Sequence, residues 1–299
     1  MIYVTQGHEE SIGLEVFLKS ISHLNQRDAS KINLICNEKT LLENLTFLKS
    51  DFDVKNESLH IFGKKISLTF FENKEPQSTT SLKIALKKTK QTDILFTLPT
   101  SKDQLVFDTK IVAGHTEFFR KHFKTQEIAM IFESPKRRTL LVTDHIPLQS
   151  VSKEITSKII FEKVSNAINS KLKTKSYYFA GINPHAGENG ILGHEDEVIT
   201  QGIEKLNQSF NCNFSGPYSG DTLHTLENKD ATFVYMYHDQ GLAPFKLENQ
   251  FIGANISLGL PFIRVSPDHG TAFNLYSKNS ANYFGTLYSL KLALAYYRK

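Results

Sequence analysis

Three histidines each lie at or just past the end of an apolar run that is typical of a buried β-strand. The runs and their histidines are Leu140–Thr143 with His145, Tyr177–Ile182 with His185, and Thr232–Tyr237 with His238. Ligands bind at the carboxyl ends of strands in open α/β sheets. Three imidazoles from separate strand ends can hold one divalent cation and leave a coordination position open, as catalytic metal sites do. Imidazole suits zinc, cobalt, nickel or iron, so the ligand type does not name the metal.

Two further histidines leave the choice of ligands open. His115 follows the apolar run Ile111–Gly114, and His269 follows Ile263–Asp268. Spacing alone does not say which three of the five histidines bind a metal. A strand followed by a polar turn with one solvated histidine explains any single run, but the repetition of the pattern favours a site.

Polar residues at two other positions have the chemistry of an anion site. Gly114, His115 and Thr116 open a helical stretch, where backbone N–H groups, a hydroxyl and an imidazole can hold phosphate. The alternative is a helix start with Thr116 as its cap. Lys102 follows the apolar run 93–98, where it is either an anion contact or an ordinary loop lysine.

Asn255 and Arg264 lie in or beside apolar strand-like runs, where they can contact a substrate carboxylate or phosphate. A surface ion pair is the alternative for Arg264. Asp221 lies in the turn 216–222 and is either a site carboxylate or a helix cap. The loop 183–193 is rich in glycine, which lets a backbone approach a ligand closely. That loop matches neither the dinucleotide-binding fingerprint nor a Walker loop.

Strands and helices in alternation must position these residues, and such alternation indicates a largely parallel sheet. The segment 49–80 is expected to be irregular or to form short antiparallel strands, and 129–132 is expected to form a hairpin with 139–143. Apolar runs predict further strands at 1–5, 32–36, 93–98, 177–182, 232–237 and 252–260. Helical stripes predict helices at 12–24, 40–48, 81–89, 151–172, 196–210 and 281–297.

Composition bounds the class of protein. With 299 residues, 40% hydrophobic and 22% charged, the chain has the composition of a globular protein of two α/β domains or one large one. The net charge of +4 is small, and the basic clusters lack the density of a nucleic-acid surface. Membrane spans need about 20 apolar residues, and no stretch approaches that length. Cys36 and Cys212 are expected to be buried free thiols of a reducing compartment. We therefore expect a cytoplasmic protein without a nucleic-acid or membrane partner.

Five motifs within about Gly114–Phe273 give the chain a resemblance to a known family. GHTEFF, GINPHAGENG, GPYSGDT, YHDQGLAPFK and NISLGLPFIRVSPDHGTA resemble those of the 4-hydroxythreonine-4-phosphate dehydrogenase (PdxA) family of vitamin B6 biosynthesis. The resemblance implies an α/β fold like that of the isocitrate and isopropylmalate dehydrogenases, with two α/β/α domains and a cleft between them. We expect the first domain at 1–108 plus 267–299. The second, at 109–266, is expected to carry most metal and substrate residues.

The resemblance also implies an activity and the residues that perform it. The family oxidises the C3 hydroxyl of 4-phosphohydroxy-L-threonine with NAD, and the product loses CO2 to give 3-amino-2-oxopropyl phosphate. The implied cofactors are NAD or NADP and one divalent cation, which is zinc, magnesium or cobalt. The implied assembly is a homodimer whose active site takes residues from both chains. By motif, the metal ligands are His145, His185 and His238; the substrate contacts are His115, Thr116, Lys246, Asn255 and Arg264; the cofactor contacts are Gly187, Glu188 and Gly190; and the candidate catalytic residues are Asp221 and Lys102.

The chain departs from the family pattern mainly near its N-terminus. Gln6–Gly13 lacks both prolines of the family's Pro-Gly-Glu-Pro-Ala-Gly-Ile-Gly, and Leu98 replaces the glycine before Pro99. Ser277–Ser280 stands where small, glycine-rich residues are expected. Three alternatives remain: a sister dehydrogenase of a phosphorylated four-carbon sugar acid, a non-catalytic phosphometabolite-binding relative, and a metal-dependent hydrolase. Leu242 after YHDQG disfavours the first, because histidine usually follows the motif in those relatives.

Overall fold

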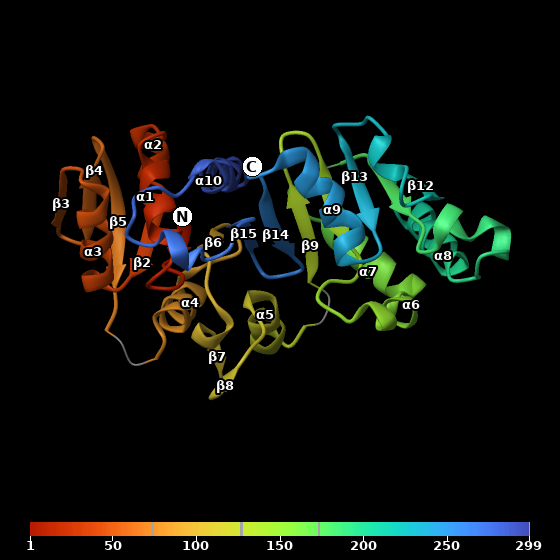
Figure 1. The fold of residues 1–299 in the computed structure, drawn as a ribbon, viewed down its shortest axis with the longest axis horizontal. Helices are drawn as coiled ribbons and strands as arrows, with labels where there is room; N and C mark the ends of the chain where they lie inside the picture. Colours follow the sequence, from red (N-terminus) through yellow and green to blue (C-terminus); the bar gives the residue numbers. More distant parts are fainter. Residues whose placement is uncertain (73–74, 126–127, 173, 299) are drawn as a thin grey trace. The chain divides into compact units, whose positions relative to one another are not determined.

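The protein is described by a computed structural model that covers residues 1–72, 75–125, 128–172 and 174–298. Its chain divides into two compact units (Figure 1). Unit 1 comprises Met1–Gln126, Phe251–Asn255 and Leu260–Lys299, and unit 2 comprises Glu127–Gln250 and Ile256–Gly259.

These bounds differ from the expected domain limits of 108/109 and 266/267. Helix α5 (His115–Phe123) falls in unit 1, because its Phe118 packs against Phe107 of that unit with ring centroids 5.3 Å apart. Arg264 also falls in unit 1, because its strand β15 (Ile263–Pro267) pairs with β6 (Ile94–Thr97). The expected second domain had included both residues.

Unit 1 contains a mainly parallel sheet in the order β15-β6-β1-β2-β5-β4-β3. The pairs β3–β4 and β4–β5 are antiparallel, so the expectation of short antiparallel strands in 49–80 is confirmed. The other strands of this sheet are β1 (Ile2–Thr5), β2 (Ile32–Cys36), β3 (Phe52–Lys55), β4 (Ser58–Ile61) and β5 (Lys64–Phe70). A separate hairpin pairs β7 (Val106–Phe107) with β8 (Lys110–Ile111).

The helices of unit 1 follow the apolar stripes of the sequence. Helix α1 (Gly13–Ile21) buries Val16, Phe17 and Ile21 completely. Helix α3 (Glu38–Leu48) begins after Asn37, whose side chain accepts a hydrogen bond from Thr40 N and so satisfies one N–H group of the first turn. The others are α2 (Gln26–Ala29), α4 (Gln77–Lys88), α10 (Phe284–Arg298) and the short η1 (Lys102–Gln104) and η5 (Phe273–Leu275).

Unit 2 contains strands in the order β12-β11-β13-β10-β9. The expected hairpin is confirmed, because β9 (Ala129–Glu133) and β10 (Arg138–Leu141) pair antiparallel. The remaining pairs are parallel and involve β11 (Ser176–Ala180), β12 (Asn213–Tyr218) and β13 (Ala231–Tyr235). Strand β14 (Ala254–Leu258) contributes residues to both units.

Two helices of unit 2 differ from expectation. The single helix expected at 151–172 is two helices, α6 (Val151–Glu154) and α7 (Ser157–Ile168). The break lies at Ile155 and Thr156, because Ile155 is extended and Thr156 caps α7 by accepting from Ile159 N at 3.1 Å. Helix α9 (His238–Asn249) was not expected, since it contains Gly241 and Pro244. The burial of its Leu242 and Phe245 in the unit 2 core outweighs these unfavourable residues.

The other helical segments of unit 2 are α8 (Asp196–Ser209), η2 (Leu148–Ser150), η3 (Pro184–Gly190) and η4 (Leu223–Thr225).

Strand β13 lies between β10 and β11, although it follows β12 in the chain. The chain therefore leaves β11 toward β12 on one side and returns to β13 on the other. Such a switch point opens a crevice at the carboxyl ends of the strands. Among the residues that the structure describes, the helices are too short or too polar to cross a lipid bilayer.

Candidate functional site

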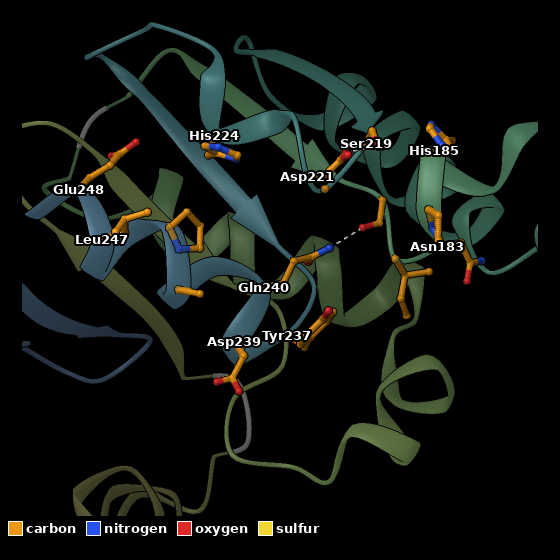
Figure 2. Close-up of a pocket in the computed structure, with 16 residues that line it drawn as sticks. Asn183, His185, Ser219, Asp221, His224, Tyr237, Asp239, Gln240, Leu247 and Glu248 are labelled. Carbon is orange, nitrogen blue, oxygen red and sulfur yellow. Dashed lines mark hydrogen bonds between the residues drawn. The ribbon is translucent and has the colours of Figure 1, made fainter.

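A cavity of about 930 Å³ opens at the switch point of unit 2, outside the carboxyl ends of β11 and β13 (Figure 2). Its wall comes from the loop after β11, the turn after β12 and one face of α9. Ala243, Pro244 and Leu247 of α9 provide an apolar side. The polar side includes Asn183, His185, Ser219, Asp221 and Gln240. Two residues singled out from the sequence, His185 and Asp221, thus lie at one site.

Gln240 joins the two strand ends beneath this cavity. Its Oε1 accepts from Met236 N at 2.8 Å. Its Nε2 donates to Gly181 O at 2.7 Å (Figure 2). A Cβ atom on Gly220 would lie 2.8 Å from Gln240 Nε2, so a larger residue there would displace the Gln240 side chain. Gln240 was missed in the sequence, because its partners are backbone groups that no motif reveals.

Asp221 is an exposed carboxylate held by its neighbour. Ser219 Oγ donates to Asp221 Oδ1 at 2.6 Å. This bond, with a smaller contribution from the charge of His185, lowers the pKa of Asp221 below its usual value of 3.8. Asp221 is therefore ionised at neutral pH and can accept a proton or contact a cation.

His145 and His238 are the two expected metal ligands that come together. Their ring centroids are 5.2 Å apart, which allows both imidazoles to face one cation. His238 is the first residue of α9, and its Nδ1 lies 2.7 Å from Asp239 Oδ1. A carboxylate behind an imidazole orients the ring and leaves Nε2 for a metal, as in many metal sites.

His185 is not part of this pair within one chain. Among the described residues, no group of three or more His, Cys, Asp or Glu side chains comes close enough to hold a metal ion. The donor type thus fits a divalent cation, while one chain brings together two of the three expected ligands. His269 is engaged elsewhere, because its Nε2 lies 2.7 Å from Thr286 Oγ1 and its Nδ1 lies 3.0 Å from Gly270 O.

His185 lies on a strained turn. All residues from His185 to Asn189 have left-handed backbone angles, with φ between 45° and 79°. Of these residues only Gly187 is a glycine, and the left-handed conformation costs the others about 1–2 kcal/mol each. Gly187 and Gly190, with φ of 79° and 92°, meet this requirement without strain. Together with Glu188 they were expected to contact the cofactor, and within the described residues none of the three lines the cavity of Figure 2.

In unit 1, His115 and Arg264 lie close enough to influence each other. Arg264 is 5% exposed, and its Nε and terminal NH2 donate to Thr97 Oγ1 at 2.9 and 2.6 Å. Burial lowers the pKa of Arg264 to about 9, so the guanidinium remains charged at neutral pH. Burial and then the charge of Arg264 lower the pKa of His115 well below 6.5, so His115 is neutral. The surface ion pair considered for Arg264 is wrong, because the side chain is buried.

Thr116 is not the cap of α5. Gly114, not Thr116, is the residue before the helix, and within the described residues no side chain caps it. The Glu117 carboxylate accepts from Ala113 N at 2.5 Å. His115 and Thr116 are the first two residues of α5, and the N–H groups of a first helical turn, an imidazole and a hydroxyl are a combination that suits phosphate.

Two other expected substrate contacts, Asn255 and Lys246, and the candidate catalytic residue Lys102 are distributed between the units. Asn255 is half-buried in β14, and among the described residues its Oδ1 is a buried acceptor without a hydrogen-bond partner. Such an atom calls for a partner, such as a water molecule or a ligand. Lys102 is exposed at the start of η1 in unit 1, and Lys246 is exposed on α9 in unit 2.

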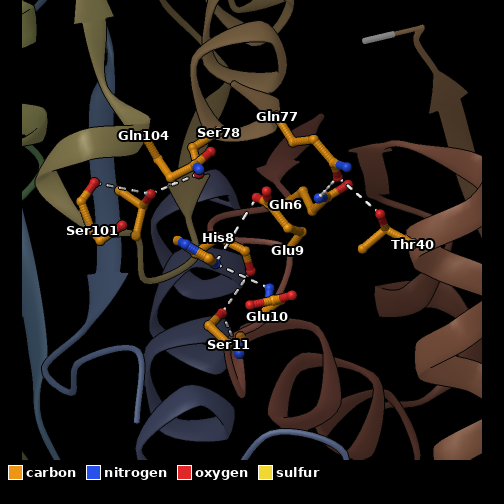
Figure 3. A network of polar contacts seen from close by, with 12 residues as sticks. Gln6, His8, Glu9, Glu10, Ser11, Thr40, Gln77, Ser78, Ser101 and Gln104 are labelled. Carbon is orange, nitrogen blue, oxygen red and sulfur yellow. Dashed lines mark hydrogen bonds and ion pairs between the residues drawn. The ribbon is translucent and has the colours of Figure 1, made fainter. Parts of the chain in front are cut away.

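Hydrogen bonds hold the loop in which the family's prolines are missing (Figure 3). Gln6 Oε1 accepts from Asn37 N at 2.7 Å, and Gln6 Nε2 donates to Gln77 Oε1. Ser11 Oγ donates to His8 O at 2.8 Å. Gly7, one of two glycines of the family stretch that remain, has a φ of 76°, and a Cβ atom there would lie 2.4 Å from Pro99 O. Side-chain hydrogen bonds thus restrain the backbone where proline rings are absent.

Comparison with known proteins places this geometry in a family. The sequence model described as "Pyridoxal phosphate biosynthetic protein PdxA" matches residues 24–293. A 4-hydroxythreonine-4-phosphate dehydrogenase from Sulfurihydrogenibium sp. (strain YO3AOP1) is 33% identical over 97% of this chain and 96% of its own length.

Solved structures show the same fold. A 4-hydroxythreonine-4-phosphate dehydrogenase from Klebsiella pneumoniae superposes with a TM-score of 0.79 at 24% identity, over 99% of both chains. A β-decarboxylating dehydrogenase from Thermococcus kodakarensis reaches 0.51 at 11% identity, over 99% of this chain and 82% of its own. The expected relation to the isocitrate and isopropylmalate dehydrogenase fold is thereby confirmed. This chain belongs to the PdxA family of pyridoxal phosphate biosynthetic proteins.

Proposed function

We propose that this protein oxidises the C3 hydroxyl of 4-phosphohydroxy-L-threonine with NAD, giving 2-amino-3-oxo-4-phosphooxybutanoate. Loss of CO2 then yields 3-amino-2-oxopropyl phosphate on the route to pyridoxal phosphate. The observation that carries the proposal is family membership over nearly the whole chain, with a relative named for this activity 33% identical across 97% of it. The side chains of the two candidate sites, at the cavity of unit 2 and at the start of α5, support it further.

The substrate phosphate is proposed to bind at the start of α5. The N–H groups there carry partial positive charge, and His115 and Thr116 add hydrogen-bonding side chains. Arg264 provides a buried cation close to His115, which an anionic ligand would stabilise. Asn255 and Lys246 are proposed as contacts to the remaining polar groups of the substrate.

The metal is proposed to be bound by His145, His185 and His238, with a second copy of the chain supplying what one copy lacks. The proximity of His145 and His238 supports this arrangement, as does the position of His185 in a separate group with Asp221. Such a cation, when bound, lowers the pKa of the substrate hydroxyl and supplies positive charge for decarboxylation. Imidazole ligands favour zinc or cobalt over magnesium. An active monomer in light scattering at assay concentration would contradict the homodimer.

Asp221 is proposed as the group that accepts the hydroxyl proton, because its carboxylate is ionised and borders the cavity with His185. Lys102 is the second candidate. Gly187, Glu188 and Gly190 are proposed as contacts of NAD or NADP. The free thiols of Cys36 and Cys212 are consistent with the reducing cytoplasm, which we propose as the location.

One assay separates this function from its alternatives. Purified protein is incubated with NAD and 4-phosphohydroxy-L-threonine, and NADH is followed by absorbance with and without a chelator. We expect NADH that the chelator abolishes and added zinc or cobalt restores. NADH formed only from a phosphorylated four-carbon sugar acid would favour the sister dehydrogenase. Substrate binding by calorimetry without any NADH would favour the non-catalytic relative.

A further inference from the structure

A buried carboxylate that the proposed mechanism does not use holds the segment immediately before the strained turn. Asp196 is the first residue of α8 and is 5% exposed. Its Oδ1 accepts from Ile182 N at 2.8 Å, and its Oδ2 accepts from Asn183 N at 3.2 Å. Both amides belong to the short segment that joins β11 to His185. One carboxylate therefore fixes two successive peptide groups immediately before the left-handed turn.

The carboxylate also fills the space beneath two glycines. A Cβ atom on Gly181 would lie 2.6 Å from Asp196 Oδ1, and one on Gly187 would lie 3.3 Å from Asp196 Oδ2. The glycines on either side of His185 therefore let the chain close around Asp196. A left-handed turn of mainly non-glycine residues persists only where surrounding contacts determine it, and these are such contacts.

We propose that Asp196 is the positioning residue for His185: it holds the Ile182 and Asn183 amides, and thereby sets where the His185 imidazole stands in the site. Asp196 does not itself contact substrate or metal in this proposal. The inference rests on the proposed function in one respect, because His185 is taken as a working residue of the dehydrogenase.

Asparagine and glutamine substitutions at adjacent carboxylates provide a matched test. In Asp196→Asn the side chain keeps its size, but one acceptor oxygen becomes an NH2 group that cannot accept from a backbone N–H. Glu195→Gln is the control, because Glu195 is exposed and its Oε2 accepts from the Asn183 side chain at 2.7 Å, whereas the Ile182 and Asn183 amides donate to Asp196.

Hydrogen exchange of individual amides is the first measurement, and it does not depend on activity. In the wild-type protein the loop amides of Ile182 and Asn183 should be protected, and unprotected amides would overturn the proposal whether or not Asp196→Asn folds. In Asp196→Asn their exchange should become roughly tenfold to a hundredfold faster, the loss expected for a hydrogen bond to a charged acceptor. Glu195→Gln should leave these rates unchanged.

Kinetics is the second measurement. We expect Asp196→Asn to lower kcat at least tenfold and to weaken binding of cobalt, followed by its absorption. Glu195→Gln should match the wild type. A lower Tm with unchanged kcat and cobalt affinity would reduce Asp196 to a stabilising residue and refute the proposal. Wild-type protein that forms no NADH would instead contradict the proposed function, and the exchange result would still stand.

Discussion

Arg264→Lys is the substitution that most sharply tests the proposed substrate site. The guanidinium is buried and aims both Nε and a terminal NH2 at Thr97 Oγ1, 2.9 and 2.6 Å away. Lysine keeps a positive charge but not the planar fork that presents several N–H groups in fixed directions. The substitution therefore tests geometry more than charge wherever the lysine is protonated.

The expected loss follows from one charge-assisted hydrogen bond to the substrate. Such a bond contributes about 1.5–3 kcal/mol, which corresponds to roughly a tenfold to hundredfold rise in KM for the phosphorylated substrate. A second effect depends on pH. Burial already lowers the pKa of Arg264 to about 9, and the same burial would lower the pKa of a lysine toward neutrality. KM of the variant should therefore rise further above about pH 7, whereas that of the wild type should not.

Steady-state kinetics between about pH 6.5 and 8.5, with NAD and substrate varied separately, measure both effects. KM for NAD should stay nearly unchanged. Arg138→Lys is a suitable control, because Arg138 pairs with Glu133 at 3.1 Å on the β9–β10 hairpin and has no proposed role in the site. If Arg264→Lys leaves the substrate KM unchanged, or raises both KM values equally, the guanidinium supports the fold and does not bind substrate.

Three further predictions concern histidines and the phosphate. Because the pKa of His115 is lowered in the folded protein, the unfolded chain binds a proton that the folded one does not as pH falls below 6.5. This residue should therefore lower the free energy of unfolding by at most about 1.4 kcal/mol for each pH unit below 6.5. Urea unfolding at several pH values should show that the unfolding free energy of His115→Gln depends less steeply on pH than that of the wild type, and equal dependence would refute the assignment. His185→Ala should lose its metal by elemental analysis while His269→Ala retains it, and full metal and activity in His185→Ala would exclude His185 as a ligand. Thr116→Val should weaken turnover of 4-phosphohydroxythreonine but not of unphosphorylated 4-hydroxythreonine, and equal losses on both would show that Thr116 shapes the fold.

Much of the fold was predictable, because alternating apolar runs and helical stripes reflect burial directly. The failures have local causes. Helix α9 contains Gly241 and Pro244, whose propensities oppose a helix that tertiary packing stabilises. The break between α6 and α7 depends on the cap at Thr156, which a continuous apolar stripe conceals.

The candidate site was predictable where it depends on strand ends and not where it depends on backbone contacts. His145 and His238 come together as the strand-end argument predicts. The position of His185 depends on the left-handed turn after β11, which the positions of the strands do not predict. Asp196 and Gln240 bind main-chain atoms, so only the folded chain identifies them.

The most direct test of the dehydrogenase assignment is to identify and quantify the products of a single reaction mixture. Purified protein, NAD and 4-phosphohydroxy-L-threonine are incubated with zinc or cobalt, NADH is measured by absorbance, and CO2 and the phosphate ester are measured by mass spectrometry. We predict NADH, CO2 and 3-amino-2-oxopropyl phosphate in equal amounts, with none formed in the presence of chelator. Binding of the substrate by calorimetry without formation of NADH, or NADH without the decarboxylated phosphate ester, would contradict the assignment.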